Sequence, residues 1–68
     1  MNDKRRQRKE QLLALWEVRS VKSGANARAV EIGNGIAANL RGTPEDCILG
    51  QSLMSDLDWQ LSRLEVAL

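Results

Sequence analysis

The feature that most constrains this chain is an apolar repeat in its last third. Alternating steps of four and three residues separate Gly50, Met54, Leu57, Leu61, Leu64 and Leu68. This spacing places an apolar row along one side of a helix, and such a row must be buried against other helices. The row covers only about two and a half heptads, which favours a helix in a small bundle over a long coiled coil.

Residues 43–46 carry the signals of a helix start. The Thr43 hydroxyl can accept hydrogen bonds from the first free amides, and Pro44 suits the first helical position. Glu45 and Asp46 would complement the positive end of the helix dipole. We therefore expect a long C-terminal helix over residues 44–67.

Residues 3–22 predict a first helix with two unlike halves. The chain is polar from Asn2 to Gln11, after which four apolar residues share one helical face: Leu12, Leu15, Trp16 and Val18. Ser23-Gly24 then predicts a stop, because glycine readily adopts the left-handed conformation of helix ends. We expect residues 1–10 to be a basic N-terminal extension of this helix, and residues 11–68 to be a single small helical domain.

Residues 26–41 allow two interpretations. As a helix they continue a row of small residues, Ala25, Ala29, Gly33 and Ala37, that lets a neighbouring backbone approach closely. As a β-hairpin, residues 18–22 and 28–32 would pair across a turn at 23–26. The helix is favoured because the apolar residues fall on one arc. The expected fold class is all-α, with three antiparallel helices over 3–22, 26–41 and 44–67. The alternative is an α+β helix–β-hairpin–helix fold.

The size of the chain predicts self-association. At 68 residues it lies below the roughly 70–80 residues at which a single core becomes comfortably stable. Cys47 is the only cysteine and histidine is absent, so we expect neither a disulfide nor a metal site, and Cys47 should be a small buried hydrophobe. We expect a homodimer. Its core or dimer seam would consist of Met54, Leu57, Leu61, Leu64, Ala29, Gly33 and Ala37.

Several classes of protein are not expected from this sequence. No apolar run reaches the 18 or so residues that span a membrane, and the basic start lacks the apolar region of a secretory signal, so we expect a cytoplasmic protein with no membrane partner. Asp56 and Asp58 point in different directions on a helix and have no histidine to assist them. We therefore expect no enzyme and no cofactor.

The first candidate for binding is a basic patch at the N-terminus. It consists of Lys4, Arg5, Arg6, Arg8 and Lys9. Such cations can neutralise phosphates, which would make nucleic acid a partner. However, residues 1–22 hold seven basic and three acidic side chains (+4), and residues 43–68 hold one basic and five acidic (−4). The alternative is that the patch pairs with the acidic C-terminal helix.

The second candidate is the side of the C-terminal helix opposite the leucine row. Trp59 lies there with Ile48 and Val66, among Ser52, Ser55 and Ser62. A large aromatic side chain on a weakly apolar face is typical of a binding hot spot. We predict a partner-binding surface made of Trp59, Ile48 and Val66, with Trp16 of the first helix as a further contact.

Three segments resemble a known family. Val18-Arg-Ser-Val21, Arg28-Ala-Val-Glu-Ile32, and Ser55-Asp-Leu57 through Leu64-Glu-Val66 resemble the strand, strand and second helix of small phage head–tail joining proteins. The resemblance covers about half of the chain. It implies a short hairpin between two helices and a role in virion assembly.

The function expected from the sequence is a small, non-enzymatic protein–protein interaction module. It would act as an adaptor, inhibitor or regulator that binds a larger protein through an apolar helix face, an architecture found in small phage and bacterial regulators. The alternatives are a nucleic-acid-binding regulator that uses the basic patch, and a virion assembly protein.

Overall fold

The computed structural model describes residues 3–22 and 27–66, with side chains up to residue 64. This part of the chain forms three helices and no strand: α1 (Asp3–Lys22), α2 (Ala27–Arg41) and α3 (Ile48–Val66). The all-α prediction is therefore confirmed. The predicted stop at Ser23-Gly24, Ala25 of the small-residue row, Leu68 of the leucine row and the side chain of Val66 lie outside the described residues.

The β-hairpin alternative is wrong for the residues that would form its strands. Residues 18–22 complete α1, and residues 28–32 lie within α2. The reason is packing, because the helix brings Ala29, Ala37 and Leu40 onto one buried face. A strand would have pointed alternate residues of this segment to opposite sides. The hairpin that the resemblance to head–tail joining proteins implied is therefore not formed by these residues.

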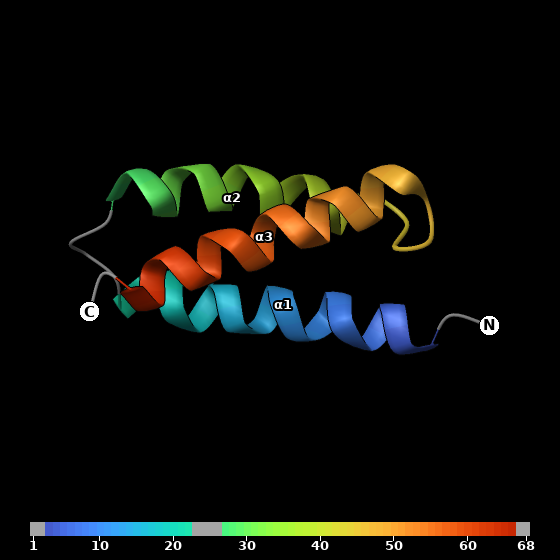
Figure 1. Cartoon of the computed structure of the whole chain (residues 1–68), viewed down its shortest axis with the longest axis horizontal. Coiled ribbons are helices and arrows are strands. Elements are labelled where there is room, and N and C mark those ends of the chain that lie inside the picture. The colour runs from blue at the N-terminus through green and yellow to red at the C-terminus, as the bar shows by residue number, and fades with distance from the viewer. Residues whose placement is uncertain (1–2, 23–26, 67–68) are drawn as a thin grey trace.

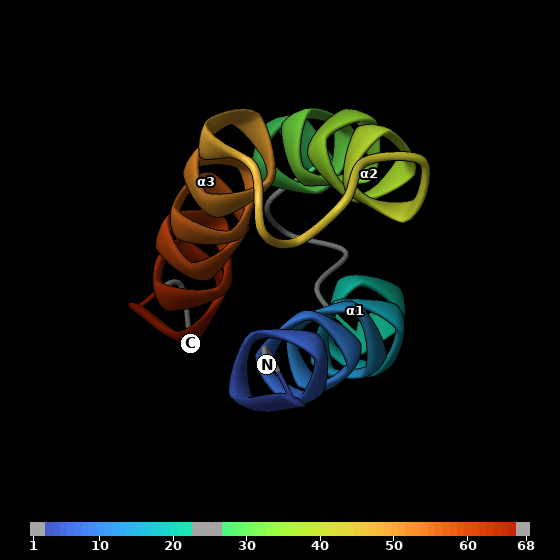
Figure 2. The ribbon, with the colours of Figure 1, turned by 90° about the vertical axis from the view of Figure 1, so that its right-hand side faces the viewer.

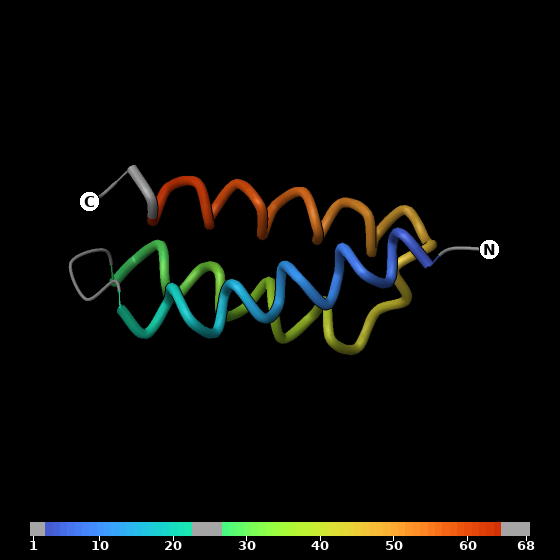
Figure 3. The backbone as a smooth tube through the Cα atoms, turned by 90° about the horizontal axis from the view of Figure 1, so that it is seen from below, coloured from blue at the N-terminus to red at the C-terminus, as the bar shows by residue number. Residues whose placement is uncertain are grey.

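The three helices run back and forth along the long axis of the molecule. α1 and α3 begin at the same end, and α2 returns between them in the sequence (Figure 1). Seen from that end, the helices occupy the corners of a triangle (Figure 2), and the tube view places α3 to one side of α1 and α2 (Figure 3). The molecule is elongated, with extents of 39 × 17 × 15 Å.

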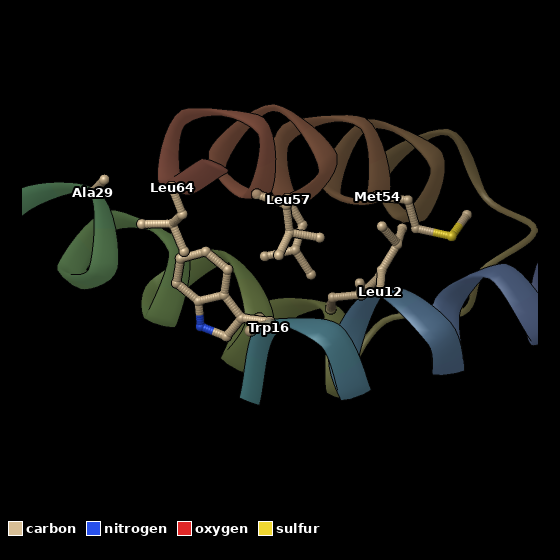
Figure 4. Close-up of a cluster of buried hydrophobic side chains, with 9 residues drawn as sticks. Leu12, Trp16, Ala29, Met54, Leu57 and Leu64 are labelled. Carbon is tan, nitrogen blue, oxygen red and sulfur yellow. The ribbon is translucent and has the colours of Figure 1, made fainter. Parts of the chain in front are cut away.

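The core lies between the three helices. α3 contributes its leucine row, and the other two helices contribute one buried face each. The buried apolar residues are Leu12, Trp16, Ala29, Ala37, Leu40, Met54, Leu57, Leu61 and Leu64. Figure 4 shows Leu12 and Trp16 pointing from α1 into the space below α3, with Leu12 beneath Met54 and the Trp16 ring beneath Leu64. Aliphatic side chains and one indole therefore hold this small domain together.

Trp16 is held by a contact that depends on glycine. Its ring lies against Gly33 so closely that a Cβ atom at that position would collide with the six-membered ring. Its indole Nε1 donates a hydrogen bond of 2.8 Å to Asn34 Oδ1. The indole is 2% exposed, so both its apolar body and its polar N–H are satisfied within the chain.

α3 begins four residues later than the sequence predicted. The Thr43 hydroxyl donates to Asn39 O at 2.7 Å and the Thr43 amide to Leu40 O at 3.1 Å, so Thr43 closes α2 and does not cap α3. The first helical hydrogen bond of α3 runs from Gln51 N to Cys47 O. Cys47 is therefore the N-cap residue.

Cys47 is exposed, which corrects the prediction of a buried hydrophobe. Its Sγ atom accepts a hydrogen bond from Gly50 N at 3.3 Å and donates one to Pro44 O at 3.2 Å. Because the helix starts at residue 48, the thiol lies outside the core. It caps the start of α3 by accepting the hydrogen bond from Gly50 N.

Candidate protein-binding face of α3

The outer side of α3 carries the largest exposed aromatic side chain of the molecule. Trp59 is 65% exposed and Ile48 is 88% exposed. The two residues lie eleven positions apart, which is about three helical turns, so they share one line along the helix. That line lies opposite Leu57, Leu61 and Leu64, whose burial turns it towards solvent. We call this side of the helix the α3 outer face.

Small and apolar residues make up much of the α3 outer face. Ser52, Ser55 and Ser62 are exposed around Trp59. The Ser62 hydroxyl donates to Asp58 O at 3.2 Å, so it is engaged by its own helix backbone. Leu49 is also exposed, beside Ile48. Leu49 was not among the predicted partner-binding residues, although its position next to Ile48 is readable from the sequence.

Two opposite charges flank Trp59 on one side. Asp56 and Arg63 are both exposed, and neither has a salt-bridge partner among the described residues. Viewed along the helix, they lie about 60° and 40° from Trp59, both in the same direction. The sequence analysis did not single them out, although their spacing relative to Trp59 is readable from the sequence.

The other two predicted partner-binding residues, Trp16 and Val66, are not seen to be exposed. Trp16 is buried between α1 and α2, so the prediction that it contacts a partner is wrong for this structure. The reason is the space left by Gly33, which admits an indole into the core. The side chain of Val66 lies outside the described residues. Trp59 and Ile48 remain as the exposed members of the predicted surface.

The predicted core or dimer seam lies inside one chain. All seven of its members, Met54, Leu57, Leu61, Leu64, Ala29, Gly33 and Ala37, are buried by the other helices. None of them is available to a second copy in this structure. An interface between copies must therefore use another surface.

Three members of the basic patch pair with acidic residues that lie before α3 and in the middle of α3. Lys9 Nζ lies 3.7 Å from Glu45 Oε1 and donates a hydrogen bond of 2.8 Å to Thr43 O. Arg5 lies 3.9 Å from Asp46, and Arg8 lies 3.6 Å from Asp58. Lys4 and Arg6 are exposed. Three of the five basic side chains thus attach α1 to the α2–α3 connection and to α3.

Other surfaces of the described residues are less distinctive. Leu15, Val18 and Val21 are exposed on α1. Ala27, Arg28, Glu31, Ile32 and Gly35 line a shallow, open depression that belongs to α2 alone. In the described part of the chain, no group of acidic, cysteine or histidine side chains is placed to hold a metal ion. None of the described helices is long and apolar enough to cross a membrane.

Comparison with known proteins adds no family to these observations. No protein-family model matches the chain, and no curated protein or solved structure matches it significantly. The α3 outer face and the basic patch are therefore the two surfaces that bear on function.

Proposed function

We propose that this chain is a small, non-enzymatic protein–protein interaction module, acting as an adaptor, inhibitor or regulator. It would bind a larger protein through the α3 outer face. The observation that supports this most strongly is Trp59, which is 65% exposed on a helix whose other side already provides the core. We also propose a cytoplasmic location and a homodimeric state.

The energetics of tryptophan support a contact role for this residue. Burying an aromatic side chain removes about 150–250 Å² of surface from water, and tryptophan is enriched among the residues that dominate binding energy. Trp59 is not part of the hydrophobic core of the described chain. Ser52, Ser55 and Ser62 around it are small, so a partner could approach the helix closely.

The basic patch supports the fold more clearly than it supports a nucleic-acid site. Lys9, Arg5 and Arg8 neutralise acidic residues of the same chain. Contacts to phosphate would have to compete with these ion pairs. For this reason the protein-binding proposal is preferred to a nucleic-acid-binding regulator. The virion assembly alternative is disfavoured, because the resemblance that supports it includes a hairpin and the described residues of that hairpin form helices.

The proposal is tested by recovering partners from the cells that make the protein. Tagged wild type and Trp59→Ala are compared, with Val21→Ala as a control because Val21 is exposed on another helix. We expect a larger protein to co-purify with wild type and Val21→Ala, and to be reduced about tenfold or more with Trp59→Ala, as for a hot-spot residue. Equal recovery with all three proteins would contradict the proposal.

A further inference from the structure

The residues around Trp59 are arranged so that the α3 outer face is complementary to itself. Counting along the helix, Asp56 lies three positions before Trp59 and Arg63 four positions after it. Ser55 lies four positions before and Ser62 three positions after. Reversing the helix direction about Trp59 therefore brings an acid opposite a base, and a serine opposite a serine.

The angular positions agree with this axial pattern. Taking Trp59 as zero, Asp56 and Arg63 lie at about +60° and +40°, while Ser55 and Ser62 lie at about −40° and −60°. In an antiparallel pair of helices related by a two-fold axis, each flank of one helix faces the same flank of the other. The charged flank would meet the charged flank, and the serine flank would meet the serine flank.

We propose that a second copy of this chain docks on the α3 outer face, with the two α3 helices antiparallel and a two-fold axis at Trp59. Asp56 of each chain faces Arg63 of the other, which gives two equivalent ion pairs. The two Trp59 rings meet at the centre. This inference rests on the proposed function, because it assigns the proposed homodimer to the same face. A larger protein that contacts Trp59 would then compete with the second copy.

The pairing uses side chains that the described chain leaves available. Asp56 and Arg63 are exposed and form no salt bridge among the described residues, in contrast to Asp58, which is engaged by Arg8. The leucine row cannot form this interface, since its own chain buries it. Ile48 lies eleven residues before Trp59, beyond the paired segment, and remains exposed for another protein.

Exchange of the two charges tests the geometry. Asp56→Arg places like charges opposite each other twice in a homodimer, and so does Arg63→Asp. An equal mixture of the two variants restores two opposite-charge pairs between unlike chains. Masses are measured by light scattering at tens of micromolar in reducing buffer, because the exposed Cys47 could otherwise form a disulfide between chains. Glu31→Arg, on the exposed surface of α2, is the control for the charge change.

We expect wild type and Glu31→Arg to have the mass of two chains. Each α3 variant alone should dissociate with a constant raised about tenfold or more, and their mixture should recover the dimer. The double variant, which carries both exchanges in one chain, should also dimerise. If either single variant misfolds by circular dichroism, the double variant still tests the pairing.

A monomeric wild type, single variants that dimerise like wild type, or a double variant that folds but stays monomeric would overturn this inference. A monomeric wild type would also refute the proposed homodimeric state, but all these outcomes leave the proposed binding of a larger protein open to its own test. A protein that co-purifies in a Trp59-dependent way with a monomeric chain would retain the proposed function while refuting the homodimer.

Discussion

The two tryptophans have opposite roles in this molecule. Trp16 occupies the core, where Gly33 leaves space for its ring and Asn34 accepts its N–H. Trp59 is exposed because its helix already buries the opposite side. The difference depends on the neighbouring helix and not on the residue type. A glycine on the facing helix decides which indole is covered.

Substitution of the two α2 glycines tests this explanation. Gly33→Ala should destabilise the fold by about 1–3 kcal/mol, because the new methyl group overlaps the Trp16 ring and forces the core to shift. Gly35→Ala, for which no atom lies within 4 Å of the added Cβ, should stabilise by up to about 1 kcal/mol through helix propensity. Urea unfolding curves of both variants give the comparison. A stabilising Gly33→Ala would show that Trp16 does not pack there.

At the residue scale, helical spacing alone predicted that Trp59 and Ile48 lie opposite the leucine row, and both are exposed on α3. Spacing could not predict the burial of Trp16. Helical spacing placed Trp16 on one face with Leu12, but it did not decide whether that face meets its own chain or a partner. Trp16 fits into the core because Gly33 has no side chain and leaves space for the indole ring. This space lies between α1 and α2, so it depends on how the two helices pack.

At the scale of the elements, the predicted start of α3 failed because Thr43 had a competing partner. Its hydroxyl donates to Asn39 O, so the residue closes α2. Threonine can serve either helix end of a short connection, and the sequence holds no signal that decides between them. Cys47 then takes the capping position, although cysteine is not a favoured cap.

The attachment of α1 to the α2–α3 connection depends mainly on Lys9. Its ammonium group makes a hydrogen bond to Thr43 O and an ion pair with Glu45, and the two side chains are only 16% and 19% exposed. Removing a partly buried, charge-assisted hydrogen bond leaves polar groups without partners. The more exposed pair of Arg8 and Asp58 should contribute little, because water screens it.

We therefore expect Lys9→Met to lower the free energy of unfolding by about 1–2 kcal/mol. Arg8→Met should lower it by about 0.5 kcal/mol or less. Thermal unfolding followed by circular dichroism compares the two at low and high salt, and added salt should reduce the small Arg8 effect further. Equal losses for both variants would mean that total charge, and not the Lys9 contact, attaches α1.

At the scale of the whole molecule, the sequence predicted the number and order of the helices and the row that forms most of the core. It did not predict how much of the chain remains exposed. α1 and α2 together cover the side of α3 that carries the leucine row. Among the described residues there is no further helix to cover the opposite side of α3. The α3 outer face is therefore a consequence of the fold, and the charges that flank Trp59 indicate what could cover it.

The central claim is that Trp59 is exposed in one chain and covered when the molecule assembles. Acrylamide quenching of tryptophan fluorescence, measured from nanomolar to high micromolar protein, tests this most directly. Trp16 is already buried within one chain, so a change in quenching with concentration reports Trp59. We predict that quenching decreases with rising concentration for wild type, and that Asp56→Arg reaches the same decrease only at about tenfold or more higher concentration. Quenching of wild type that remains strong and unchanged across the whole range would contradict the claim.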